Sequence, residues 1–257
     1  MADIEVAIHD RVAVVTLNRP AVRNAMTLAM WQEIARLYGD LGRDPAVRAI
    51  LLAGAGGDFS VGADIAEFGK VRDDAAQSAA YELAVDASSD AIQAAPKPTI
   101  AVLSGYCLGG GCHLAMACDF RIAGRDARIG IPAAKLSIVY GIRSTQRLAA
   151  LVGVTHAKRI LYTAERFTAD EALAMGFVSE VADDPLAAAG AFAGGMAGNA
   201  PLSVAGAKFI LDGVAMGAGA LDVAAAQRLI DQAGDSDDYR EGRAAFAEKR
   251  APDFRGR

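Results

Sequence analysis

The sequence predicts an α/β fold with a helical region at its C-terminal end. Short β-branched or apolar runs alternate with helix-type segments up to about residue 190. Beyond that point the pattern is mainly helical. The chain has 257 residues, 53% of them hydrophobic, which is enough for one large domain with an appendage. We therefore place a core over residues 1–190 and a helical region over residues 191–257.

The individual elements follow from the periodicity of the apolar residues. Thr27 is expected to open an amphipathic helix whose apolar residues lie on one side, and a second helix is expected near residues 75–94, before Pro96. A third helix is expected to follow the glycine triplet Gly109–Gly111. Strands are expected at residues 4–8, 12–17, 47–54, 99–105, 119–123 and 127–130.

Charge and composition exclude several classes of protein. The formal net charge of -5 gives no electrostatic basis for binding nucleic acid or an anionic membrane. Residues 185–207 carry no charge, but Asn199-Ala200-Pro201 interrupts them, so packed helices are expected there rather than a membrane span. The N-terminal residues contain acids and no long apolar run, so no secretory signal is expected. Together these features favour a cytoplasmic protein.

The three cysteines lie close together in an apolar segment, at Cys107, Cys112 and Cys118. An odd number does not suggest a disulfide framework. Their spacing matches no zinc pattern, and Cys112 and Cys118 would lie on different faces of one helix. Buried thiols are therefore expected, with no metal site.

Two passages join a strand, a glycine-bearing loop and a helix start: "LLAGAGGDFSVGADI" and "IAVLSGYCLGGGCHLAM". Backbone N–H groups at a helix start have no intrahelical partner. Two such ends that converge would form an oxyanion hole from main-chain donors, and small residues would let a carbonyl oxygen reach them. The alternative is a pair of ordinary tight turns. Neither passage has the GxGxxG spacing of a dinucleotide site.

The segments "FSVGADI", "KPTIAVLSGYCLGGGCHLAMACDFRIA", "STQRL" and "REGRAAFAEKRAPDF" resemble the enoyl-CoA hydratase/isomerase, or crotonase, superfamily nearly end to end. The resemblance implies a crotonase-like spiral of ββα units with a C-terminal helical trimerisation region. It implies homotrimers, often paired into hexamers. It also implies an acyl-CoA thioester substrate, an enolate stabilised at the thioester oxygen, and no cofactor beyond that coenzyme A. Carried onto this sequence, the two donors are the N–H groups of Ala63 and Gly110.

The residues that transfer protons depart from the family pattern. Hydratases of this family use two glutamates, in "GGGCE" and "GxPE", where this chain reads "GGGCH" and "GIPA". His113 and Ala133 therefore replace them, and alanine cannot transfer a proton. His113 could act as a single acid or base, or be a core histidine held by a neighbour. Tyr140 lies level with a pocket tyrosine of family decarboxylases and is a second catalytic candidate, with space filling as the alternative.

Several further residues are candidates for binding the substrate. Arg23 matches a position where relatives contact CoA phosphates, whereas Asp64 could instead cap its helix and Glu67 is expected to be a surface charge. Arg143 could hold a substrate carboxylate or hydroxyl together with Tyr140, or be paired on the surface. The candidate substrate-binding residues are Arg23, Ala25, Gly62, Ala63, Asp64, Ile65, Gly109, Gly110 and Arg143.

The sequence therefore predicts an acyl-CoA thioester enzyme of the enoyl-CoA hydratase/isomerase class that lacks both usual glutamates. One alternative is an acyl-CoA decarboxylase or isomerase that uses Tyr140 or His113. The other is an acyl-CoA binding protein without catalysis. Turnover of enoyl-, dienoyl- or malonyl-type CoA esters distinguishes the enzymes from the binding protein.

Overall fold

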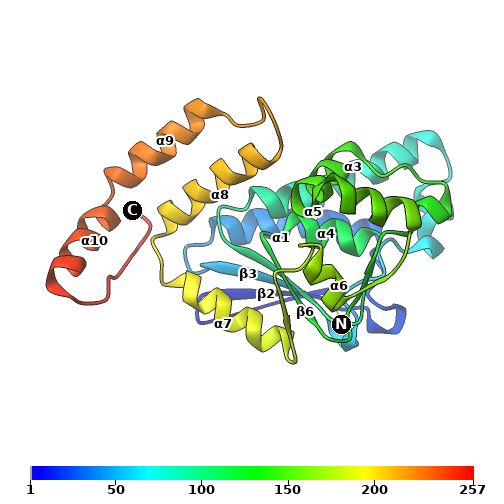
Figure 1. Ribbon diagram of the computed structural model, residues 1–257, viewed down its shortest axis with the longest axis horizontal. Coiled ribbons are helices and arrows are strands. Elements are labelled where there is room, and N and C mark those ends of the chain that lie inside the picture. The colour runs from blue at the N-terminus through cyan, green and yellow to red at the C-terminus, as the bar shows by residue number, and fades with distance from the viewer. Residues whose placement is uncertain (1) are drawn as a thin grey trace.

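The computed structural model describes residues 2–257 and is built on a six-stranded sheet (Figure 1). The strand order is β1-β2-β3-β4-β6-β9, and every pair except the antiparallel β1 and β2 is parallel. The strands are β1 (Ile4–His9), β2 (Val12–Leu17), β3 (Ala49–Gly54), β4 (Thr99–Leu103), β6 (Phe120–Gly124) and β9 (Glu180–Ala182). A smaller sheet joins β5 (Tyr106–Leu108), β7 (Arg128–Gly130) and β8 (Phe167–Thr168).

Helices cover both faces of the large sheet, and α8 to α10 extend to one side of it (Figure 1). The helices are α1 (Leu28–Arg43), α2 (Phe68–Val71), α3 (Ala75–Ala94), α4 (Gly110–Ala117), α5 (Ile142–Thr163), α6 (Ala169–Ala174), α7 (Pro185–Ala197), α8 (Pro201–Ala215), α9 (Val223–Gly234) and α10 (Asp237–Glu248). The predicted α/β fold with a C-terminal helical region is confirmed.

The alternation of side chains along β3 explains the two layers. Ile50 and Leu52 join the core that includes α1, α3 and α4, whereas Leu51 faces the opposite side and joins the core formed with α7. Side chains of a strand point alternately to the two faces of its sheet. A strand buried on both faces therefore reads as a continuous apolar run, as β3 does.

Most predicted elements are present close to their expected bounds, including α3 and the helix that Thr27 caps through the Met30 N–H. The helix expected after the first glycine loop is different. The loop opens into a 3-10 turn at Ile65–Glu67, which is followed by the single α-helical turn of α2. A macrodipole needs a run of aligned peptide units, so its contribution at Ala63 is small.

The uncharged segment 185–207 forms α7 and the start of α8, as predicted. The predicted boundary at residues 190–191 falls inside α7, which packs on the large sheet through Ala189 and Ala193. Within residues 2–257, no helix has the length and apolar character needed to span a membrane.

A partly buried ion pair joins α8 to the core. Lys208 donates to the Asp119 carboxylate at 3.0 Å and to the Lys97 carbonyl at 3.1 Å. The same Asp119 oxygen accepts hydrogen bonds from the Thr99 N–H and hydroxyl. Because these groups satisfy the buried charges, the pair fixes α8 against the ends of β4 and β6.

Candidate active site

The two glycine loops lie against each other through their backbones. A Cβ atom added at Gly62 would lie 2.6 Å from the Gly110 nitrogen, and one added at Gly111 would lie 2.5 Å from the Ser60 carbonyl oxygen. Gly109, just before α4, has φ of 51° and ψ of -110°, a conformation that favours glycine. The glycines therefore allow the two loops to contact each other. This role is separate from any role in admitting a ligand.

Two backbone donors remain unpaired where these loops meet. The residues on either side of Ala63 bond to Met26. The Met26 N–H donates to the Gly62 carbonyl at 2.8 Å, and the Asp64 N–H donates to the Met26 carbonyl at 2.9 Å. The N–H of Ala63 lies between them and points away from Met26, since extended backbone alternates its N–H groups. Within residues 2–257, neither this N–H nor that of Gly110 donates a hydrogen bond. Both residues are half-buried.

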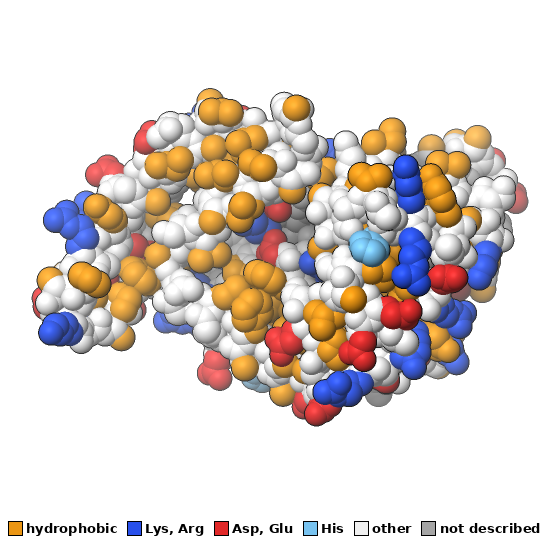
Figure 2. All heavy atoms as spheres, viewed as in Figure 1, with side chains coloured by type: hydrophobic (Ala, Val, Ile, Leu, Met, Phe, Trp, Pro, Cys, Tyr) orange, Lys and Arg blue, Asp and Glu red, His pale blue; other side chains and the backbone are white. Residues whose placement is uncertain are grey.

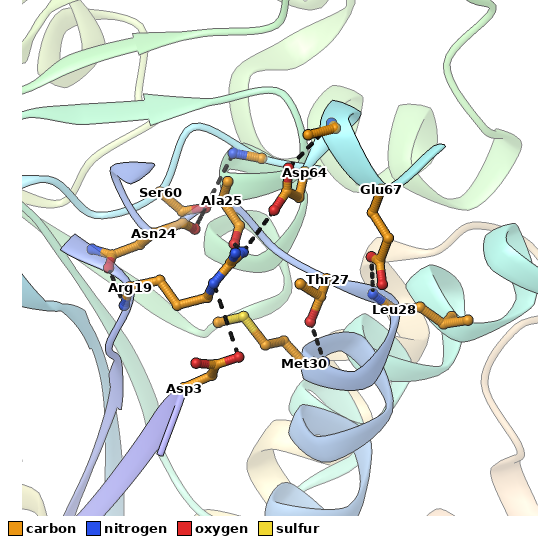
Figure 3. A network of polar contacts seen from close by, with 12 residues as sticks. Asp3, Arg19, Asn24, Ala25, Thr27, Leu28, Met30, Ser60, Asp64 and Glu67 are labelled. Carbon is orange, nitrogen blue, oxygen red and sulfur yellow. Dashed lines mark hydrogen bonds and ion pairs between the residues drawn. The ribbon is translucent and has the colours of Figure 1, made fainter. Parts of the chain in front are cut away.

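The first loop is fixed by Arg19, which sequence analysis did not identify (Figure 3). Its guanidinium donates to the Ala25 carbonyl at 2.6 Å and to the Asp64 carboxylate at 2.9 Å. Asp64 also accepts the Ala66 N–H and so caps the 3-10 turn, as one alternative predicted. Ile65 beside it is 63% exposed. The ion pair therefore holds the residue that follows the first donor.

Glu67 also fixes this loop, which corrects its expected role as a surface charge. Its carboxylate accepts the Leu28 N–H at 2.9 Å, at the first residue of α1 (Figure 3). A negative charge at a helix N-terminus is favourable because the N–H groups there are unpaired. The C-terminal end of the first loop is therefore held by both Arg19 and the start of α1.

The buried guanidinium of Arg121 holds the opposite end of α4. It donates to the Cys118 carbonyl at 2.7 Å and to the Ala115 carbonyl at 3.3 Å, which are acceptors at the C-terminal end of that helix. The three cysteines around α4 are buried free thiols, as predicted. Sequence analysis did not identify Arg121 as a helix cap.

His113 lies one turn along α4 from Gly110 and is only 4% exposed. Its Nε2 lies 3.2 Å from the Val85 carbonyl of α3, and its Nδ1 lies 2.8 Å from the Ser144 hydroxyl of α5. A carbonyl only accepts, so Nε2 carries the proton and Nδ1 accepts from Ser144. Burial, and then the charge of Arg147, lowers the pKa of His113 to about 4. The ring is therefore neutral at pH 7, with both nitrogens occupied.

Tyr140 lies beside the second donor. Its hydroxyl is 3.5 Å from the Gly109 carbonyl, so this hydrogen bond is long and weak. Burial raises the pKa of Tyr140, so the phenol is protonated at neutral pH. Ala133, which stands where hydratases carry their second glutamate, is buried and offers no polar group.

The two candidate arginines already have neighbours. Arg143 pairs with Asp90 of α3, and its side chain is 57% exposed. Arg23 lies 3.8 Å from Asp58 and stacks over the Tyr106 ring with its guanidinium carbon 4.8 Å from the centroid. The structure therefore places the Tyr140 hydroxyl at the carbonyl end of the peptide whose N–H is the second donor, and it places Arg143 and Arg23 in ion pairs.

Comparisons with known proteins show the family to which the chain belongs. The family model for enoyl-CoA hydratase/isomerase matches residues 7–257. The chain is 36% identical to the 2,3-dehydroadipyl-CoA hydratase of Escherichia coli, over the full length of both. It is 38% identical to the short-chain-enoyl-CoA hydratase of Clostridium acetobutylicum, over 76% of this chain and 75% of that protein.

Solved structures show the same fold. An enoyl-CoA hydratase/isomerase family protein of Hyphomonas neptunium superposes with a TM-score of 0.94 at 36% identity, covering 100% of this chain and 98% of that one. The enoyl-CoA hydratase of Bacillus anthracis superposes with a TM-score of 0.89 at 32% identity, covering both chains fully. The chain therefore belongs to the enoyl-CoA hydratase/isomerase family, whose enzymes act on acyl-CoA thioesters.

Proposed function

We propose that the protein binds an acyl-CoA thioester with its carbonyl oxygen between the N–H groups of Ala63 and Gly110, and that it catalyses a reaction through the thioester enolate. The observation that supports this most is the pair of unpartnered donors where the two loops touch. An enolate oxygen carries more negative charge than the ground-state carbonyl. Fixed donors therefore stabilise the transition state more than the bound substrate.

The site favours chemistry that needs one proton-transfer group. Addition of water across an enoyl double bond by two carboxylates has no support here, because His113 and Ala133 stand in their places. His113 is neutral and hydrogen-bonded at both nitrogens, which favours a positioning role between α3, α4 and α5. Tyr140 is protonated at neutral pH and makes only a long hydrogen bond to the Gly109 carbonyl, which favours it as the proton donor. Decarboxylation fits these groups, with no cofactor beyond the substrate's CoA: loss of CO2 leaves its electron pair in the thioester enolate, Tyr140 then protonates the enolate carbon, and the phenolate regains a proton from water. Isomerisation would in addition need a base to remove a proton from the substrate.

The N–H of Gly110 can be removed by Gly110→Pro, because proline lacks a backbone donor. We expect turnover of the best CoA ester to fall about 10²–10³-fold, the usual cost of one oxyanion donor. Ala75→Pro is the matched control: it places proline at the exposed first residue of α3, where the N–H has no helical partner. A folded Gly110→Pro protein with the parent's turnover would contradict the oxyanion assignment.

Tyr140→Phe removes the proposed acid and keeps the ring. We expect turnover to fall about 10²–10⁴-fold with the affinity for the CoA ester preserved, and we expect His113→Gln to lower turnover far less.

We also expect the parent to hydrate crotonyl-CoA weakly or not at all. Steady-state assays on a panel of CoA esters measure both. Rapid crotonyl-CoA hydration by the parent would show that hydration does not need the two missing glutamates. Binding of every ester without turnover would favour the alternative of a binding protein without catalysis.

The burial of His113 also makes stability depend on pH. Its folded pKa of about 4 lies below the unfolded value of about 6.5, so the unfolded chain binds a proton first as the pH falls. The contribution of the neutral His113 to the free energy of unfolding is therefore fully present above about pH 6.5. It is lost as the pH falls from about 6.5 to 4, and the loss reaches about 3 kcal/mol. Urea unfolding of the parent and of His113→Gln measures this loss. An identical pH dependence in the two proteins would show that His113 is not the group responsible.

Apolar side chains on the C-terminal helices support the proposal that the chain assembles into trimers or paired trimers. Leu211 and Val214 of α8, Ile230 of α9 and Phe246 of α10 are 66%, 63%, 52% and 88% exposed. Figure 2 shows apolar side chains gathered over these helices. An isolated chain would leave this surface in contact with water.

Light scattering at micromolar concentration is expected to give three or six times the chain mass. Phe246→Glu should lower that mass, because it places a charge in the apolar contact. A dilute monomer that still binds a CoA ester would contradict the assembly and leave the oxyanion site unaffected.

A further inference from the structure

Two arginines of α5 share one carboxylate at its N-terminal end. Asp90 accepts from Arg147 through Oδ1 at 2.6 Å and pairs with Arg143 through Oδ2. Arg147 is buried and also donates to Ser89 through Nη1 and to Gln93 through Nε and Nη2. Within residues 2–257, Arg143 makes only the one ion pair, through Nη1. The cluster therefore carries an excess positive charge, and the exposed Arg143 holds unused donors.

These arginines line a cavity of about 1250 Å³ between α3, α5 and the C-terminal helices. Figure 2 shows the molecule hollowed between α8 and the core. The opposite wall of the cavity carries Lys208, which is already paired with Asp119, and also Asp212, Asp222 and Arg228. The exposed arginines of the lining with unused donors are therefore Arg143 and Arg228, and Arg143 is the one whose segment leads to the oxyanion site.

The segment that carries Arg143 begins beside the oxyanion site. The Tyr140 hydroxyl lies at the Gly109 carbonyl, and Ser144, next to Arg143, bonds to His113 of α4. Arg143 lies three positions after Tyr140, so their Cα atoms are at most about 11 Å apart. An extended acyl chain of roughly five or six carbons and the side chain of Arg143 can together bridge a span of that order.

We propose that Arg143 binds a carboxylate at the far end of the acyl group, so that the site selects CoA thioesters of short dicarboxylic acids. This inference rests on the proposed binding of acyl-CoA at Ala63 and Gly110. Asp90 and Arg147 are positioning residues, because they orient the Arg143 guanidinium and do not touch the ligand. The planar guanidinium suits a carboxylate, with which it forms paired charge-assisted hydrogen bonds.

Isothermal titration calorimetry with adipoyl-CoA, hexanoyl-CoA and free CoA tests this inference. The two esters have the same chain length and differ in the terminal carboxylate. We expect the parent to bind adipoyl-CoA at least about tenfold more tightly, as one charge-assisted hydrogen bond provides. Arg143→Gln should abolish the preference and leave hexanoyl-CoA affinity within about twofold. Arg125→Gln, which removes an exposed arginine paired with Asp183, is the matched control and should change neither affinity.

The outcomes separate the two proposals. Equal affinities of the parent for both esters, or a preference that survives in Arg143→Gln, would overturn the role of Arg143 and leave the acyl-CoA site standing. Failure of all three compounds to bind would overturn the proposed function as well. If Arg143→Gln changed the sedimentation coefficient and not the preference, the arginine would belong to an interface between copies, which also overturns the inference.

Discussion

The close contact between the backbones at Gly62 and Gly110 is the constraint on which the site depends. No side chain fits between the two loops, because even a Cβ at Gly62 would lie 2.6 Å from the Gly110 nitrogen and 2.8 Å from the Leu108 oxygen. This contact brings together two N–H groups that secondary structure leaves unpaired. On the proposed assignment, both donors are in place before the ligand binds, which is the condition for electrostatic stabilisation without reorganisation.

On the same assignment, the polar side chains around the two loops hold the loops in contact and do not themselves transfer protons. Arg19 and Glu67 fasten the first loop, and Arg121 holds the far end of α4. His113 completes the set by linking α4 to α3 and α5. At His113 a neutral, hydrogen-bonded ring occupies a buried position where a carboxylate would be costly to ionise. For this reason we propose Tyr140, and not His113, as the group that donates the proton.

Local patterns predicted the elements whose signals are long or chemically distinctive. The twenty-residue α3 and the cap at Thr27 could be found because their cues lie within a few positions of one another. The strands β8 and β9, of two and three residues, carry too little pattern to be recognised. The purpose of the glycine triplet was only partly predicted. Glycine signals a close approach, but the sequence does not say that Ser60, about fifty positions away, is the neighbour.

The same limit applies to charged residues, whose partners are set by the fold. Asp64 and Arg19 are separated by 45 positions, and Arg143 and Asp90 by 53. Resemblance to the family identified the donors at Ala63 and Gly110, and the structure adds that both are unpaired among the described residues. The sequence was enough to locate His113 and Ala133, the residues that depart from the family pattern. The neutral state of His113 could be inferred only from the structure, which shows its burial and its hydrogen-bond partners.

The most direct test of the central claim is a crystal structure of the protein with a bound acyl-CoA thioester. The account predicts that the thioester oxygen lies about 2.7–3.1 Å from the nitrogens of both Ala63 and Gly110. A well-ordered thioester whose oxygen lies more than about 3.5 Å from either nitrogen would contradict it.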